Sequence, residues 1–352
     1  MELFLIPFIT AFLISFLVTP ILIKIAPKFG LVDNPRTSTH PAKLHKIPVP
    51  RGAGIVFWAS TVPVILINLP LETKFVGIAA GLTIAAVIGV LDDRFNLNPY
   101  FRLIINFLAA AVIVLAGVGI TFITNPLDGI IRLDTIILSF DFLGKFVLYP
   151  VAAAFALLWI VFVANMLNWS SGVDGQIPGI IVIAAVILAA LSTRFVSYDP
   201  NQIQLIKLAA ILAGSAAGFL IFNWHPAKIF PGYGVIVWGM LTATLAILAG
   251  AKVATAILIL AVPFADGVVT IVRRIATGRS PVWGDRGHLH HLLLAKGFSQ
   301  STIAIFYWTV TLILGFFALS LSSSAKAFAI TFVIIVVVGA ILWLNFILTE
   351  KS

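Results

Sequence analysis

The stretch LFLIPFITAFLISFLVTPILIKI, from Leu3 to Ile25, decides the class of fold. It is an apolar run of the length that a helix needs to cross the hydrocarbon core of a bilayer. Because no small-residue cleavage site follows it, we expect this helix to be retained rather than removed as a signal. Of the 352 residues, 61% are hydrophobic and 10% are charged, and the mean hydropathy is +1.13. The sequence therefore predicts a polytopic membrane protein.

Similar apolar runs recur along the chain. They predict about eleven spans, near 3–24, 53–70, 75–91, 102–119, 149–166, 177–193, 205–223, 233–249, 253–272, 303–321 and 327–348. With the N-terminus outside and the C-terminus inside, 15 of the 22 lysines and arginines fall in inner segments, as the positive-inside rule requires. We expect one all-α domain, residues 1–352, in the cell (cytoplasmic) membrane.

Composition also bears on what the protein binds. The absence of cysteine rules out a disulfide framework and thiolate metal sites. The formal charge of +9 is explained by retention of basic loops inside the cell, so we expect no nucleic-acid partner. The connection 120–148 alternates apolar and polar residues around two turn signals, which predicts a small β-hairpin over the outer face.

VLDDRFNLNP, residues 90–99, closes the third predicted span with two adjacent carboxylates, Asp92 and Asp93. Two carboxylates about 4 Å apart repel by roughly 4 kcal/mol at an effective dielectric constant near 20, and a divalent cation reverses that sign. The pair is typical of a magnesium site or a general base. The alternative is an ion pair between Asp93 and Arg94 at the membrane surface, and the dipeptide does not decide between the two.

Two other inner segments have residues suited to binding anions. ANMLNWSSGVDGQIPG, residues 164–179, offers amides, hydroxyls and Asp174 beside glycines, which can hold a nucleotide or phosphate. Its alternative is an ordinary helix end with a glycine cap. VDNPRTSTHPAKLHKIPVPRGAG, residues 32–54, is the most basic stretch and suits phosphate or anionic head groups. Its alternative is simple retention of positive charge inside the cell.

GDRGHLHHLLL, residues 284–294, holds three of the six histidines: His288, His290 and His291. On a helix, His288 and His291 would share a face while His290 would point away, and no cysteine or nearby glutamate would complete a zinc site. Asp285 is placed as an N-cap before the histidines. The same loop also carries Arg273, Arg274, Arg279 and Arg286. The favoured interpretation of this loop is a binding site for phosphate or pyrophosphate.

Taken together and in this order, LDDRFNLNP, NMLNWSSGVDG, FNWHPAKIF and DRGHLHHLLL resemble the motifs of the polyprenyl-phosphate N-acetylhexosamine-1-phosphate transferases. This family includes the phospho-N-acetylmuramoyl-pentapeptide translocase. The resemblance implies an enzyme of cell-envelope glycan synthesis with its active site at the cytoplasmic helix ends. A polyprenyl phosphate (undecaprenyl phosphate) in the bilayer would attack the β-phosphate of a UDP-HexNAc donor and release UMP, assisted by Mg²⁺ or Mn²⁺. The spacing of the histidines is similar to the N-acetylglucosamine-1-phosphate branch. A homodimer is left open.

The resemblance also assigns residues. The catalytic and metal-binding set is Asp92, Asp93 and Asp174. The substrate-binding set is Lys43, His45, Asn168, Asn223, Asp285, Arg286, His288, His290 and His291.

The sequence departs from the family pattern at two positions: Ser171 and Tyr233 stand where the family usually has aspartates. Tyrosine is a poor magnesium ligand at neutral pH. These departures leave an alternative function, a catalytically weakened relative that binds a lipid-linked sugar or acts as a scaffold. A transporter is disfavoured because the ionisable residues gather on one side rather than at the bilayer midplane.

Overall fold

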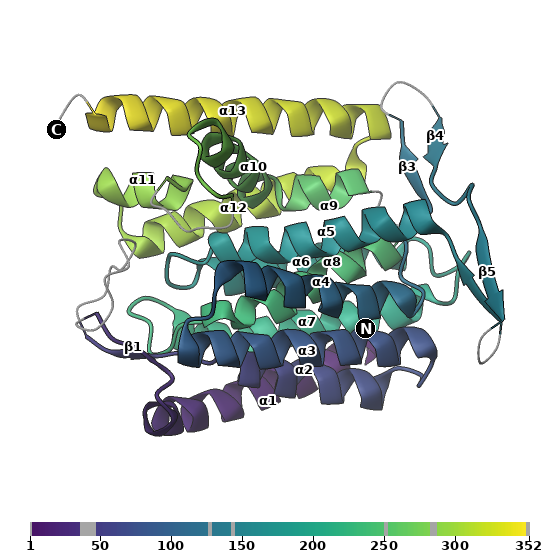
Figure 1. The fold of residues 1–352 in the computed structure, drawn as a ribbon, viewed down its shortest axis with the longest axis horizontal. Coiled ribbons are helices and arrows are strands. Elements are labelled where there is room, and N and C mark those ends of the chain that lie inside the picture. The colour runs from purple at the N-terminus through teal and green to yellow at the C-terminus, as the bar shows by residue number, and fades with distance from the viewer. Residues whose placement is uncertain are drawn as a thin grey trace.

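The computed structural model of the protein describes residues 2–35, 47–125, 129–141, 145–249, 253–281 and 287–349. Helices dominate this part of the chain (Figure 1). They are α1 Glu2–Ile25, α2 Gly54–Asn68, α3 Thr73–Phe95, α4 Pro99–Leu115, α5 Pro150–Trp169, α6 Gln176–Thr193, α7 Gln202–Asn223, α8 Val235–Leu248, α9 Val253–Ile259, α10 Ala261–Ala276, α11 Leu289–Ala295, α12 Gln300–Ser320 and α13 Ser323–Thr349. Two short 3₁₀ helices, η1 Ala26–Phe29 and η2 Gly232–Gly234, complete the helical elements.

Among the described residues, seven helices are long and apolar enough to cross a membrane, and three shorter apolar helices accompany them. Each predicted apolar run coincides with one of these helices or with the pair α9 and α10. This agreement confirms an all-α polytopic membrane protein, while the number of spans and the orientation stay predictions.

The ninth predicted run, 253–272, does not form one continuous helix. It is broken into α9 and α10, whose axes differ by 92°. Pro263 accounts for the position of the break, because its ring lacks an N–H donor and clashes with the carbonyl four residues earlier, at Ile259, where α9 ends. The bend directs α10 across the other helices, as Figure 1 shows.

Close packing between distant segments holds the bundle together. The helices α1 to α8 lie side by side with roughly parallel axes in Figure 1, and α1 packs against α7 and α2. Gly214 and Gly218 of α7 make the contact with α1 close, because a Cβ at Gly218 would lie 2.5 Å from the Phe12 carbonyl oxygen. The glycines therefore bring the first and seventh helices together although they are far apart in the sequence.

The strands lie at the two ends of the bundle. The expected single hairpin within 120–148 is corrected to two antiparallel pairs: β3 Phe122–Thr124 with β4 Ile130–Arg132, and β5 Leu138–Asp141 with β6 Lys145–Leu148. A third pair, β1 Val32–Asp33 with β2 Val49–Pro50, lies at the opposite end in Figure 1, where the C-terminus also lies.

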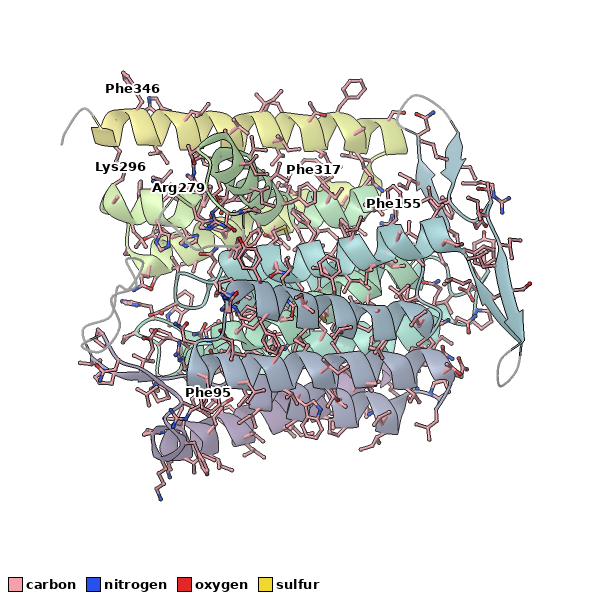
Figure 2. The ribbon with its side chains drawn as sticks, viewed as in Figure 1. Phe95, Phe155, Arg279, Lys296, Phe317 and Phe346 are labelled. Atoms are coloured by element: carbon pink, nitrogen blue, oxygen red, sulfur yellow. The ribbon has the colours of Figure 1, made fainter. Side chains whose placement is uncertain are left out.

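The end of the bundle near β1 carries the motifs. Figure 2 labels Phe95 at the end of α3, together with Arg279 and Lys296, toward this end, whereas Phe155 of α5 lies toward the hairpins. Phe346 points outward from α13 and is 62% exposed, as expected for a side chain that faces lipid. The polar motifs therefore share one end of an otherwise apolar bundle.

Candidate active site

A cavity of about 580 Å³ opens between α4, α5, α10 and Pro281 with residues 287–291, which we call the histidine segment. Its apolar lining residues are Pro99, Leu103, Phe107, Leu158, Val161, Phe162, Ile271, Ile275 and Pro281. Its other lining residues, most of them polar, are Arg102, Asn165, Asn168, Trp169, Ser171, Gly172, Tyr233, Arg274, His288, His290 and His291. The cavity therefore joins an apolar surface to a set of cations, hydrogen-bond donors and imidazoles.

Arg102 supplies a positive charge to the cavity lining. Its Nη1 donates to Asp92 Oδ2 over 2.9 Å, and its guanidinium carbon lies 4.7 Å from the centre of the Tyr233 ring. The Tyr233 hydroxyl accepts a hydrogen bond of 2.9 Å from Asn106 Nδ2, which fixes the ring under the guanidinium. The residue that departs from the family pattern thus supports an arginine at the cavity.

The two adjacent aspartates point to different partners. Asp92 is paired with Arg102 and also accepts the Leu97 N–H over 3.0 Å. Asp93 accepts the backbone N–H groups of Gly52 and Tyr233, over 3.0 and 3.1 Å. The alternative ion pair between Asp93 and its sequence neighbour is absent from the hydrogen bonds and ion pairs recorded for the described residues. Asp93 instead links the end of α3 to the backbone at Gly52 and at Tyr233.

Asp174 lies in the turn between α5 and α6 and has partners different from those of the first two aspartates. Its Oδ2 is 2.8 Å from His225 Nδ1 and accepts the Ala227 N–H over 3.1 Å. Its own backbone N–H donates to Gln300 Oε1 over 3.0 Å. Its carboxylate therefore connects the motif NMLNWSSGVDG to the motif FNWHPAKIF. Asp174 does not line the cavity.

The two predicted asparagines differ in the same way. Asn168 of α5 lines the cavity. Asn223, at the end of α7, is 1% exposed, accepts the Gly175 N–H over 3.0 Å and donates to the Ile229 carbonyl over 2.9 Å. With both ends of its amide engaged, Asn223 holds two loops together and does not meet a ligand in this arrangement.

The three histidines meet at the cavity, contrary to the expectation from a helical wheel. The ring centres of His290 and His291 are 4.2 Å apart, and those of His288 and His290 are 5.6 Å apart. The reason is that α11 begins only at Leu289, so His288 is the extended N-cap residue and is not on the helix. The predicted N-cap role of Asp285 is therefore wrong.

Helix α10 positions the histidine segment. Arg274 Nη1 donates to the Pro281 carbonyl over 2.7 Å, and Arg273 Nη1 donates to the Gly287 carbonyl over 2.8 Å. Arg274 is 2% exposed, and its guanidinium carbon lies 5.6 Å from the centre of the Trp169 ring. The two arginines therefore hold the residues on either side of 282–286. Asp285 and Arg286 fall within that range, and Lys43 and His45 fall within 36–46, so all four lie outside the described residues.

The described carboxylates do not fit a shared metal centre. Within the described ranges, no group of three or more histidine, aspartate or glutamate side chains has a metal-binding arrangement. Asp92 is neutralised by Arg102, Asp93 accepts two backbone N–H groups and Asp174 is bonded to His225. Magnesium needs near-octahedral oxygen ligands, and these three side chains do not offer them jointly. We therefore assign no step to a metal.

Sequence reasoning missed several cavity residues because their signals are weak in isolation. Arg102 is identified from the sequence only as an inner positive charge, and Trp169 has no signal of its own. Asn165, by contrast, belongs to the stretch 164–179 whose amides are predicted to hold a nucleotide or phosphate, and it does line the cavity. Arg274 was included in the basic loop but was given no position. A charged residue at the first position of the predicted span 102–119 is the signal that could have selected Arg102.

His290 allows a prediction about pH and stability. Burial, followed by His291 and His288, holds the pKa of His290 well below its usual range. Below about pH 6.5 an unfolded histidine is protonated while His290 stays neutral in the fold, so the stability of the fold decreases as pH falls, by up to about 1.4 kcal/mol per pH unit. We expect the apparent unfolding temperature in detergent to fall less between about pH 7.5 and 5.5 in His290→Gln than in the native protein. An equal fall in both would contradict this assignment.

The fold and the cavity define a multi-pass membrane protein with an amphipathic, basic site at one end. Residues 75–250 match the model of glycosyl transferase family 4. The match covers half of the chain, which therefore belongs to this family and is a transferase.

Relatives over most of the chain agree with this assignment. The chain is 29% identical to a probable undecaprenyl-phosphate N-acetylglucosaminyl 1-phosphate transferase of Bacillus subtilis, over 98% of this chain and 92% of that protein. It is 28% identical to a decaprenyl-phosphate N-acetylglucosaminephosphotransferase of Mycolicibacterium smegmatis, over 85% and 78% of the two chains. It is 26% identical to a phospho-N-acetylmuramoyl-pentapeptide-transferase of Gemmatimonas aurantiaca, over 89% and 91%.

Proposed function

We propose that this protein transfers N-acetylglucosamine-1-phosphate from a UDP-sugar to a polyprenyl phosphate in the cell membrane and releases UMP. An oxygen of the lipid phosphate attacks the β-phosphorus of the donor, and the bond to the oxygen of UMP breaks. The product is a lipid diphosphate sugar. The names of the relatives from Bacillus subtilis and Mycolicibacterium smegmatis support the lipid phosphate as acceptor and N-acetylglucosamine phosphate as the transferred group.

The observation that carries the proposal is that apolar and basic side chains line the same cavity. Leu103, Phe107 and Phe162 offer apolar surface beside Arg102 and Arg274. A lipid with a phosphate head group has this combination of surfaces, because its chain needs an apolar neighbour and its phosphate needs charged donors. A soluble sugar nucleotide alone would leave the apolar lining residues without a function.

The basic residues of the cavity lining reduce the repulsion between the two anionic substrates, which is the main obstacle to the reaction. The nucleophile and the donor are both anions, so they repel each other until cations reduce the charge between them. Preorganised donors in a site shielded from water act strongly on such developing charge. Arg102 and Arg274 line the cavity together with three imidazoles, which makes them the groups of this chain suited to hold the phosphates.

The orientation follows from the same chemistry. A UDP-sugar is water-soluble, whereas the acceptor stays in the bilayer with its phosphate at the surface. A site at the cytoplasmic helix ends lets both substrates meet without crossing the membrane. The excess of basic residues predicted for the inner segments supports this side.

Magnesium and the assembly state are separate parts of the proposal. Mg²⁺, or Mn²⁺ in its place, is expected from the resemblance, and substrate phosphates commonly supply ligands to such ions. Because the described carboxylates do not form a joint site, we expect any bound cation to depend on the donor diphosphate. A homodimer is the proposed alternative to a monomer.

The test is a UMP-release assay with the purified full chain in detergent. Undecaprenyl phosphate is the acceptor, and UDP-N-acetylglucosamine, UDP-N-acetylgalactosamine and UDP-glucose are compared as donors, with and without Mg²⁺. We expect UMP release with UDP-N-acetylglucosamine that requires the lipid. Release from none of the donors would overturn the proposal and favour the weakened relative. Release without the lipid would show hydrolysis instead of transfer.

A further inference from the structure

Asp266 is a buried carboxylate in α10 that the predicted site does not include. The residue is 0% exposed, and its Oδ2 lies 2.8 Å from His288 Nδ1. Its Oδ1 accepts the Leu289 backbone N–H over 2.9 Å. A buried aspartate is unfavourable without such partners, so its two contacts account for its place in the core. Both contacts are to the histidine segment.

These contacts favour one tautomer of His288. A carboxylate without a proton only accepts hydrogen bonds, and opposite such a carboxylate His288 Nδ1 is the donor. Thr270 Oγ1, the other group near Nδ1, is at 3.3 Å and is the weaker partner. With Nδ1 occupied, Nε2 is the nitrogen that His288 can offer to a ligand in the cavity that this residue lines.

We propose that Asp266 is the positioning residue of the histidine cluster, holding His288 as the Nδ1–H form so that Nε2 faces the phosphate groups in the cavity. This inference rests on the proposed function. A carboxylate on Nδ1 fixes the tautomer and the ring orientation, and it stabilises the imidazolium that forms when an anion binds. When His288 takes up a proton from water as the anion binds, Nε2 also carries a proton and donates it in a hydrogen bond to the phosphate, while Asp266 itself makes no contact with the substrate.

The position of Asp266 in the fold supports a role of this kind. It lies after the 92° bend between α9 and α10, so the bend sets where the carboxylate meets His288. Arg273 and Arg274, farther along α10, hold Gly287 and Pro281 of the same segment. The helix therefore fixes the backbone of the segment with its arginines and the imidazole orientation with its aspartate.

The decisive experiment uses Asp266→Asn in the full chain. The amide has nearly the same shape and can still accept the Leu289 N–H, but its NH₂ group faces His288 Nδ1 and requires that nitrogen to be unprotonated. We expect kcat for UMP release to fall by roughly 10²-fold or more. In ¹⁵N-histidine NMR spectra in detergent, the His288 signals, assigned by comparison with His288→Gln, should change from Nδ1–H to Nε2–H.

Controls separate this role from a structural one. Asp134→Asn removes a carboxylate on the β4 side, where Asp134 pairs with Arg132, and should leave kcat and the His288 signals unchanged. An Asp266→Asn protein with native activity, or a native His288 that is neutral with the proton on Nε2, would overturn the inference, and the second measurement needs no folded variant. If the native protein releases no UMP with any donor, the proposed function fails instead, while the NMR result still reports on the pair.

Discussion

Replacing Arg102 with glutamine should lower the rate of UMP release by about 10²- to 10³-fold, the usual loss when one preorganised donor for developing charge is removed. Arg102 lines the cavity and is paired with Asp92 over 2.9 Å. The glutamine removes the positive charge of Arg102 from the cavity lining. It also leaves the Asp92 carboxylate with the Leu97 N–H as its remaining hydrogen-bond donor. The measurement is kcat and KM for both substrates in detergent.

The matched controls use the same kind of change nearby. Arg94, in the same motif, is exposed, and its guanidinium carbon lies 5.4 Å from the Phe95 ring, so Arg94→Gln should retain activity within about twofold. Arg102→Lys should give an intermediate loss, because lysine keeps the charge but not the planar group stacked on Tyr233. Arg102→Gln with more than half of the native rate would show that the cavity is not the reaction site.

Replacing Gly172 with alanine should reduce activity by about 10²-fold, comparable to the effect of a 1 Å misplacement in an active site. A Cβ at Gly172 would overlap His290 Nε2. His290 is 0% exposed, so the added methyl group displaces either the imidazole or the 170–172 turn. Either shift separates the second motif from the histidine cluster at the cavity. The measurement is kcat together with the apparent unfolding temperature.

A double-mutant cycle tests the cause of that loss. If the overlap with His290 is responsible, Gly172→Ala should lower the unfolding temperature much less in a His290→Ala background, since the imidazole is gone. Gly339→Ala is the matched control, because a Cβ there has no neighbour within 4 Å, and it should leave both activity and stability unchanged. Equal losses of unfolding temperature in both backgrounds would rule out the overlap as the cause.

The sequence predicted the helices well because hydrophobic length is a local property. The apolar run of α1 and the later runs needed no tertiary information, and their helices lie where the pattern placed them. The pattern failed at 253–272 because it measures hydrophobicity and not direction, although Pro263 was visible as a signal for a break. It also merged two hairpins into one, since alternation does not reveal where one strand pair ends and the next begins.

The candidate site was predicted in its composition but not in its geometry. The histidine motif does contribute three rings to the cavity, yet the wheel argument separated His290 from His288 because it assumed a helix that begins earlier than α11 does. Adjacent aspartates suggested one shared site, but Asp92 and Asp93 have different partners. Partners such as Arg102 and Asp266 come from other helices, and no spacing along the chain indicates them.

The sequence by itself determined that the protein lies in a bilayer, where its helices are and which kinds of side chains gather at one end. These properties depend on length, apolarity and motif composition, which are read residue by residue. What only the tertiary structure decided is which of these side chains meet. His288 meets Asp266, Arg102 meets Tyr233, and Asn223 is turned into the core. The physical reason is that hydrogen bonds and ion pairs act over about 3 Å, and only the packing and bending of helices far apart in the chain bring such groups within that distance.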